Sequence, residues 1–261
     1  MARAAVPRIA VVSDGSGLPE SDDLQAALRE DADLIGRLAG VGVRPAVILA
    51  ADAAGLAAGV RALPPEIGSV LLAHVEPERA LAVQQELRDS GARPTMTEQD
   101  ALSIALAIAT LDVLTDGGRR LDASRIVLAG TSELPGLVTL LMATGVGDIT
   151  TWNKPDSEVF PLNRIMAGAD VLIDLINARP AGDALHHTGT RLITWDDAHA
   201  AVHVAAGLLR AAADLPGATL DLETYRSFAL ALTATGDFAS AALTRLVLRV
   251  ATTVFKTRQA R

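Results

Sequence analysis

Short apolar runs alternate with longer amphipathic segments along most of the chain. Runs rich in Val, Ile and Leu with turn residues at their ends predict strands, and segments with helical periodicity fit between them. The predicted strands are Arg8–Ser13, Arg44–Ala50, Ser69–His74, Arg125–Ala129, Asp148–Trp152, Asp170–Leu175 and Arg191–Trp195. The predicted helices are Asp22–Leu38, Ala51–Ala62, Glu76–Ser90, Glu98–Leu114, Leu134–Thr144 and Ser157–Met166. Strict β/α alternation of this kind predicts an α/β protein with parallel sheets flanked by helices.

The end of the chain has a different pattern. Three consecutive helical segments, Ala198–Ala213, Leu222–Ala234 and Phe238–Thr257, follow the last predicted strand without another strand between them. A polar turn from Thr115 to Arg120 follows the long helix that ends at Leu114. We therefore expect two lobes, 1–114 and 115–261, the second beginning with a Rossmann-like strand–turn–helix unit and ending in the helical tail.

Composition narrows the class of protein. Of the 261 residues 50% are hydrophobic but only 3% are aromatic, which suits aliphatic parallel strands covered by helices. The absence of cysteine excludes disulfides and thiolate chemistry. A net charge of −8 argues against nucleic acid as a partner. Neither a signal peptide nor an apolar run of membrane-spanning length is found, so we expect a cytoplasmic protein without a membrane segment.

Several segments together resemble one family. Ile9–Ser16 (IAVVSDGS), Leu38–Val47 (LAGVGVRPAV), Leu121–Val127, Ala167–Ile173 and Gly207–Ala212 resemble, in the same order, segments of bacterial malic enzymes. The resemblance implies a two-lobe malic-enzyme-like architecture and the oxidative decarboxylation of malate. That reaction needs a nicotinamide cofactor, a divalent metal, a general base and a general acid.

The residues that the resemblance implies for metal binding and catalysis are replaced. An acidic metal-ligand pair would stand at Ala73 and His74, and a second pair at Glu98 and Gln99, or at Asp100 if the register is shifted. At most one or two carboxylates remain, too few for magnesium or manganese. We therefore expect no metal. The run Thr97–Gln99 has an alternative interpretation as a helix N-terminus capped by Thr97. Asp31 stands at the position of the family's lysine.

The family's tyrosine motif, which would precede Ile9, is not found in this sequence, whose one tyrosine is Tyr225. A carboxylate cannot replace a lysine tuned to act near neutral pH without changing the chemistry, and Asp31 makes that replacement. Malic enzyme activity should therefore be absent.

A degenerate dinucleotide-binding turn follows the strand that ends at Ala129. Gly130 and Gly136 remain of the glycines that let backbone amides approach a pyrophosphate, while Glu133 brings a repulsive charge and Pro135 offers no amide. Asn153 and Lys154 follow the next strand, where a hydroxyl and a phosphate could be bound. No cofactor is expected, although weak NAD(P) binding through Gly130, Gly136, Asn153 and Lys154 remains open beside a plain strand–helix turn.

Other polar residues are weaker candidates for a functional site. Asp196, Asp197, His199 and His203 could hold a transition metal, but the acids also suit a helix start. His186 and His187 lie in a predicted loop. Because parallel strand ends share one sheet edge, we expect Asp14, His74 and Glu98 to converge as catalytic groups in a cleft between the lobes; the alternative is that His74 only packs at a strand end.

Two functions remain open. The first is a pseudoenzyme that has lost malate oxidation and binds a small acid, a nucleotide or a protein partner. The second is an enzyme with a repurposed pocket between the lobes, performing acid–base chemistry on a small metabolite in a biosynthetic pathway, or a residual NAD(P)-dependent oxidoreductase. The apolar helix faces between Leu222 and Val254 also predict a homodimer.

Overall fold

The computed structural model describes residues 7–19, 22–178, 189–235 and 243–260. As far as they are described, these residues form two compact units. The first comprises Met1–Ala101, Val202–Thr224 and Ala239–Arg261, and the second comprises Leu102–Ala201 and Tyr225–Phe238. The division differs from the two continuous lobes expected from the sequence, because most of the helical tail returns to the first unit.

The first unit is built on a parallel four-stranded sheet of order β2-β1-β3-β4. Its strands are β1 (Pro7–Ser13), β2 (Gly42–Val47), β3 (Ser69–Leu72) and β4 (Thr95–Thr97). Central strands lie between covered faces and are therefore mainly apolar: Ile9–Val12 is apolar at every position, and in Ser69–Leu72, which is also buried throughout, only Ser69 is polar. Pro45 lies in β2, an edge strand, where a missing amide is tolerated.

Local signals fix the helices around this sheet. α1 (Leu24–Ala39) starts at Asp23, whose side chain accepts hydrogen bonds from the first-turn amides, and ends at Gly40 with a φ of 67°. α2 (Ala53–Arg61) and α3 (Pro77–Asp89) are capped by Asp52 and Glu76. Both α2 and α3 pack on one face of the sheet, where their apolar side chains join those of β1 and β3 in one core.

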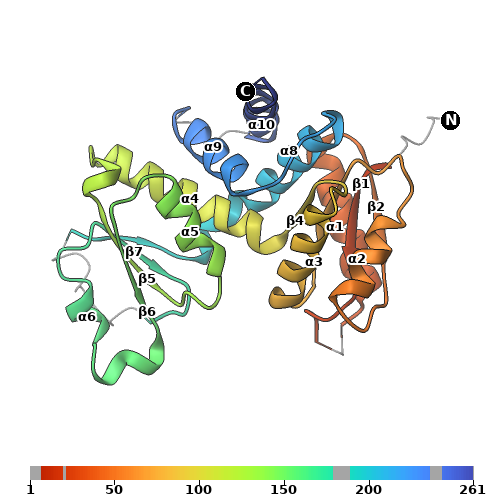
Figure 1. Ribbon diagram of the computed structural model, residues 1–261. Helices are drawn as coiled ribbons and strands as arrows, with labels where there is room; N and C mark the ends of the chain where they lie inside the picture. The colour runs from red at the N-terminus through yellow and green to blue at the C-terminus, as the bar shows by residue number, and fades with distance from the viewer. Residues whose placement is uncertain (1–6, 20–21, 179–188, 236–242, 261) are drawn as a thin grey trace. The chain divides into compact units, whose positions relative to one another are not determined.

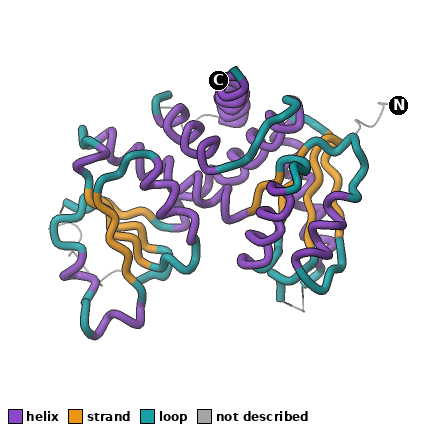
Figure 2. Tube along the Cα trace, viewed as in Figure 1, coloured by secondary structure: helices purple, strands orange, loops and turns teal. Residues whose placement is uncertain are grey.

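The second unit has a parallel sheet of the equivalent order, β6-β5-β7-β8. Its strands are β5 (Arg125–Ala129), β6 (Asp148–Trp152), β7 (Val171–Asp174) and β8 (Arg191–Ile193). The helices are α4 (Glu98–Asp116), which begins in the first unit, α5 (Pro135–Ala143) and the short α6 (Leu162–Ile165). Figure 2 shows the strands of each sheet running side by side with helices around them. This unit is Rossmann-like.

The tail forms α8 (Ala201–Asp214), α9 (Leu222–Thr233) and α10 (Leu243–Gln259), labelled in Figure 1. Gly207 permits close packing of α8 against α10, because a Cβ atom there would lie 2.2 Å from Val247 Cγ1. His203 Nδ1 also lies 2.7 Å from Thr244 Oγ1, which ties the same two helices together. Within the described residues, every helix is too short or too polar to cross a membrane.

The predicted fold class is confirmed, since both sheets are parallel, helices flank them and the tail is helical. The helix predicted at Ser157–Met166 is wrong in its first half, where a 3-10 turn at Lys154–Glu158 precedes α6, because Pro161 offers no amide to a continuous helix. The strand β4 was too short to be predicted from periodicity. The predicted start of the last helix, at Phe238, lies outside the described residues.

Candidate active site

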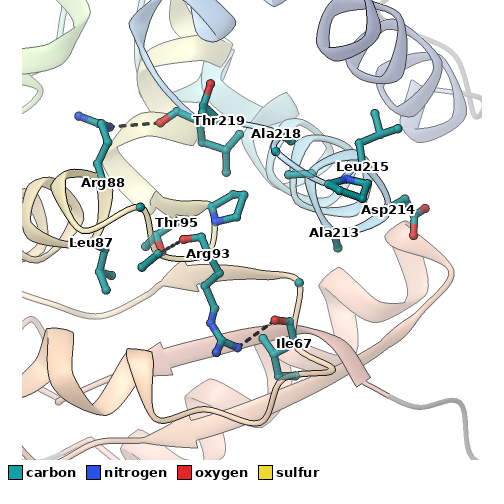
Figure 3. A pocket seen from close by; sticks show the side chains of 18 of the residues that line it. Ile67, Leu87, Arg88, Arg93, Thr95, Ala213, Asp214, Leu215, Ala218 and Thr219 are labelled. Carbon is teal, nitrogen blue, oxygen red and sulfur yellow. Dashed lines mark hydrogen bonds between the residues drawn. The ribbon is translucent and has the colours of Figure 1, made fainter. Parts of the chain in front are cut away.

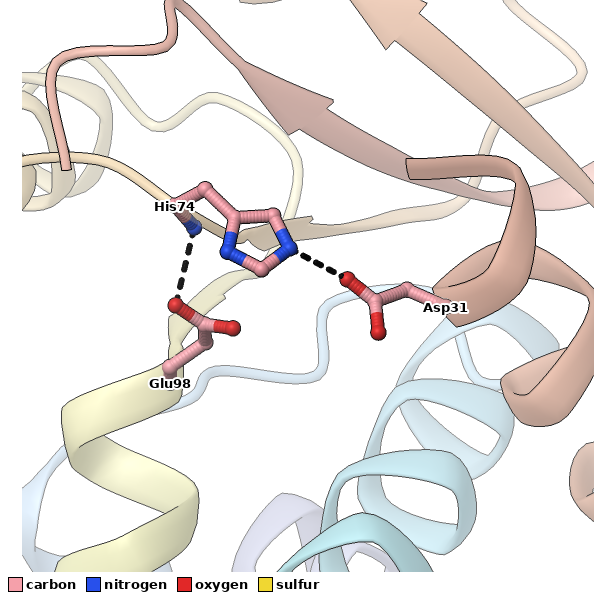
Figure 4. A group of neighbouring side chains, drawn as sticks. All are labelled: Asp31, His74 and Glu98. Atoms are coloured by element: carbon pink, nitrogen blue, oxygen red, sulfur yellow. Dashed lines mark hydrogen bonds and ion pairs between the residues drawn. The ribbon is translucent and has the colours of Figure 1, made fainter. Parts of the chain in front are cut away.

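Three polar side chains from three separate elements meet beyond the carboxyl end of β3. Asp31 is the eighth residue of α1, His74 lies in the loop after β3, and Glu98 is the first residue of α4. All belong to the first unit. One ligand-type atom from each side chain lies within 4.8 Å of the others. Figure 4 shows the imidazole ring of His74 between the two carboxylates.

The backbone of His74 is held firmly in an uncommon conformation. Its φ is 52°, in the left-handed region that few residues other than glycine adopt. Its N–H donates to Glu98 Oε2 at 2.8 Å, and its carbonyl accepts from Ser13 Oγ and from the Gly17 amide at 3.0 Å. This turn ends β3 at Leu72, two residues earlier than the predicted strand, and sets the direction of the ring.

The two ring nitrogens of His74 have different surroundings. Nε2 lies 2.8 Å from Asp31 Oδ2. Nδ1 faces the Glu98 carboxylate in Figure 4, and no hydrogen bond joins it to any residue that the structure describes. A carboxylate at one nitrogen orients an imidazole and leaves the other nitrogen for proton transfer or for a ligand. The side chains of His74 and Asp31 are 22% and 33% exposed, so solvent reaches the group.

Glu98 is largely buried. Burial raises the pKa of Glu98, and the charge of Asp31 acts in the same direction, whereas the hydrogen bond from the His74 amide opposes both. The predicted role of Thr97 as a helix cap is confirmed, since its hydroxyl accepts from the Asp100 amide while Asp100 accepts from the Thr97 amide. Glu98 is therefore not needed for capping and turns toward His74 instead.

The structure places Asp14 in a different set of contacts. Its side chain is 1% exposed, accepts from Ser16 Oγ at 2.6 Å and pairs with Arg79 Nη1 at 2.7 Å. Burial alone would raise the pKa of Asp14, but the hydrogen bonds from Ser16 and the ion pair with Arg79 outweigh it and hold that pKa below its ordinary value. Asp14 thus closes the loop after β1, where its hydrogen bonds go to Ser16 and Arg79 rather than to His74.

The turn after β5 contains Gly130, and contacts within the chain account for a glycine at this position. Gly130 has a φ of 89°, and a Cβ atom there would lie 2.6 Å from the Ile176 side chain. The N-terminus of α5 has Leu134 at its cap, without a side-chain hydrogen bond, and Pro135 in its first turn. Asn153 Oδ1 accepts from Thr131 Oγ1 at 3.3 Å. Glu133 and Lys154 are both exposed, and Gly136 lies in the first turn of α5.

The other polar candidates are not brought together as a site. His199 is exposed and lies against the carbonyl of Asp196, whereas His203 contacts Thr244 in α10. Asp197 forms a capping box with Thr194, which supports the helix-start interpretation of the two acids. His186 and His187 lie outside the described residues.

A cavity of about 670 Å³ lies in the first unit, at the opposite edge of its sheet from His74. Figure 3 shows it at the amino ends of the strands, near Ile67 and Thr95. Its arginines are already engaged by backbone oxygens: Arg88 donates to the Leu220 carbonyl and Arg93 to those of Leu63, Pro64 and Ile67. These contacts join loops, and they leave no cluster of free cationic groups in the described lining.

The two parallel α/β units define the class of protein, and comparison with solved structures identifies the fold as malic-enzyme-like. A malic enzyme from Pyrococcus horikoshii superposes with a TM-score of 0.75 at 17% identity, covering 96% of this chain and 76% of that chain. An NAD-dependent malic enzyme from Thermotoga maritima gives 0.75 at 15% identity, with 94% and 83% covered. The Entamoeba histolytica malic enzyme gives 0.75 at 16% identity, with 96% and 69% covered.

No protein-family model matches the sequence, and no curated protein sequence matches it. The similarity to malic enzymes therefore lies in the fold, as the resemblance of the sequence segments predicted. Sequence reasoning identified His74 and Glu98 but assigned Asp31 only to the place of a lysine. One signal could have identified Asp31 as a site residue. Asp31 and His74 both stand at positions where the resemblance implies catalytic or metal-binding groups, so the two side chains could have been expected to lie close together.

Proposed function

We propose that this malic-enzyme-like protein does not oxidise malate, and that it serves instead to bind a small ligand or a partner. The observation that carries the proposal is the contact between Asp31 Oδ2 and His74 Nε2 at 2.8 Å. The resemblance implies a lysine at the first position and a carboxylate metal ligand at the second. The arrangement of charge is therefore the reverse of the one that malate chemistry requires.

The electrostatics of the group argue in the same direction. Asp31 and Glu98 place two carboxylates around one imidazole, and no lysine or arginine within the described chain forms an ion pair with either of them. A dicarboxylate such as malate would meet repulsion there, because like charges a few ångströms apart repel strongly where solvent screens them incompletely. A cationic or hydrogen-bond-donating ligand is favoured.

Dinucleotide binding remains a weaker proposal. Gly130 has an explanation within the chain, because a Cβ atom there would meet the Ile176 side chain, and Glu133 is exposed beside the turn where a diphosphate would approach. If NAD(P) binds, Gly136, Asn153 and Lys154 would contact it, and the cofactor would supply hydride transfer. We expect such binding to be weak.

The second candidate function is an enzyme with acid–base chemistry on a small metabolite. The specific observation in its favour is the orientation of His74: Asp31 holds Nε2, so that Nδ1 is left to exchange a proton. A backbone fixed by Ser13, Gly17 and Glu98 would keep the ring in place during such a reaction.

The primary test is malate-dependent reduction of NAD and NADP, followed by absorbance with magnesium or manganese present. We expect no turnover above a matched Asp31→Asn variant. Turnover that scales with the amount of wild-type protein and disappears in the variant would overturn the proposal. A thermal-shift screen with nicotinamide dinucleotides, C4 acids and small amines then separates ligand binding from an inert fold.

We also propose a cytoplasmic homodimer as the working form. The proposal rests on the apolar pattern of the tail sequence, because in the structure the apolar side chains of these helices, Phe228, Val247 and Phe255 among them, are buried within the chain. Light scattering at tens of micromolar concentration should give twice the chain mass of 27.0 kDa, and a monomer would contradict the proposal.

A further inference from the structure

We propose that Asp31, His74 and Glu98 form a binding site for a borderline divalent cation of the zinc class. The inference goes beyond the proposed function, since the protein could lack malate activity with or without such an ion. It also departs from the absence of metal expected from the sequence, where the positions of His74 and Glu98 were considered only as ligands for magnesium or manganese.

The spacing of the three side chains suits one ion. Bonds of about 2.1 Å to a common ion place tetrahedral ligands roughly 3.4 Å apart. One atom from each of Asp31, His74 and Glu98 already lies within 4.8 Å of the others, so small rotations of flexible carboxylates would close the site. The three residues come from α1, the loop after β3 and the start of α4, so the fold itself brings them together.

The donor set selects the kind of ion. Magnesium requires near-octahedral oxygen coordination and is poorly served by an imidazole. One nitrogen and two carboxylate oxygens match a three-ligand zinc site with an open fourth position for water or a small ligand. The hard-cation site that the malic-enzyme-like fold implies therefore does not fit these residues, whereas a transition-metal ion does.

Charge and orientation support the same inference independently of spacing. Two carboxylates flank His74 without an ion-pair partner from any lysine or arginine that the structure describes, so a cation would neutralise the group. The ring nitrogen that such an ion would share with Asp31 is Nε2, which already lies 2.8 Å from Asp31 Oδ2. The ring is held by a backbone at φ 52°, bonded through both its N–H and its carbonyl.

The test is direct metal binding to the full chain after removal of metals by a chelator. Isothermal titration with zinc, manganese and magnesium should give one zinc ion per chain and clearly weaker binding of magnesium. Cobalt(II) should produce the intense visible absorption of a low-coordinate nitrogen–oxygen site, a readout that does not depend on any catalytic activity. Binding should release protons and weaken as the pH falls.

Variants then assign the ion to these residues. His74→Asn is preferred to alanine, because asparagine tolerates a positive φ. We expect His74→Asn, Asp31→Asn and Glu98→Gln each to weaken zinc binding by at least about 10-fold, as loss of a ligand or its close support does. Matched controls are Asp33→Asn, an exposed acid on the same helix, and His199→Ala, an exposed histidine elsewhere; both should bind as the wild type does.

Several results would overturn the inference. They are the absence of stoichiometric zinc binding, equal affinity for magnesium, or loss of binding in His199→Ala with retention in His74→Asn. Circular dichroism checks that each variant is folded. The malate assay tests the proposed function separately, because a metal-free protein without malate turnover would contradict this site alone.

Discussion

Glu98 accepts a hydrogen bond from the backbone amide of His74 at 2.8 Å, across 24 positions of sequence. The bond links the start of α4 to the turn after β3 and helps to hold His74 at its positive φ. It also requires a carboxylate to remain largely buried beside Asp31, whose charge repels it. The buried charge of Glu98 therefore lowers the stability of the folded protein, and substitution or a change of pH should alter that stability measurably.

Glu98→Gln should stabilise the metal-free protein at neutral and higher pH. The glutamine carbonyl can still accept the His74 amide, while the buried charge is removed. Burial raises the pKa of Glu98, so the ionised form opposes folding, and the wild type gains stability as the pH falls through that raised pKa toward 4.5. The advantage of the variant should therefore shrink with falling pH. Urea unfolding with a chelator present measures it, and exposed Glu30→Gln is the control.

Asp221 and Arg258 should anchor α10 in a pH-dependent way. Hydrogen bonds from Arg258, Thr224 and Thr219 outweigh the opposing effect of burial and lower the pKa of Asp221 to about 2. A depressed carboxyl pKa gives stability that is complete above the ordinary value of 3.8 and is lost as the pH falls toward about 2. Asp221→Asn should thus cost about 1–2 kcal/mol at neutral pH and almost nothing in strong acid.

Denaturant unfolding over a pH series checks the Asp221 prediction. Glu86→Gln removes the partner of Arg61 from a pair whose side chains are both 38% exposed, so it should cost no more than about 0.5 kcal/mol. Equal losses in the two variants would show that the Asp221 pair is an ordinary surface contact.

Asp112 should be an unfavourable charge in α4. Burial, followed by the neighbouring charge of Asp116, raises the pKa of Asp112 to about 6. The protein should therefore gain stability from this group as the pH falls through about 6 toward 3.8. Asp112→Asn should stabilise by about 1 kcal/mol at slightly alkaline pH, after allowance for solvent screening. Asp116→Asn, which removes only the repulsion, should give a smaller gain, and a larger one would contradict the assignment to burial.

The two glycines of the turn after β5 should respond differently to alanine. Gly130 has a φ of 89° and a Cβ atom there would meet the Ile176 side chain at 2.6 Å, so Gly130→Ala should destabilise by about 1–3 kcal/mol. Gly136 lies in α5, with Ser103 Oγ at 3.8 Å as the near neighbour, so Gly136→Ala should be neutral or slightly stabilising. Thermal unfolding compares them. Equal destabilisation would mean that Gly136 also has a structural role.

The alternation of elements could be predicted from the sequence because its signals are local. Ile9–Val12 and Ile126–Ala129 are apolar at every position, as strands covered on both faces must be, and Asp23 and Asp52 cap helices from adjacent positions. The resemblance of ordered segments also predicted the malic-enzyme-like fold that the solved structures show. The predicted end of the strand at His74 was wrong, because the positive φ of His74 turns the chain and the strand already ends at Leu72.

The composition of the site was decided by the tertiary structure. His74 and Glu98 were selected from the sequence, but Asp31 lies 43 positions before His74, and only the packing of α1 beside the sheet brings its carboxylate to the ring. The tertiary structure also pairs Asp14 with Arg79 in an ion pair, which the sequence did not predict. Hydrophobic periodicity and caps act over a few residues and can be read along the chain, whereas the meeting of side chains from distant elements depends on strand order and on how helices pack.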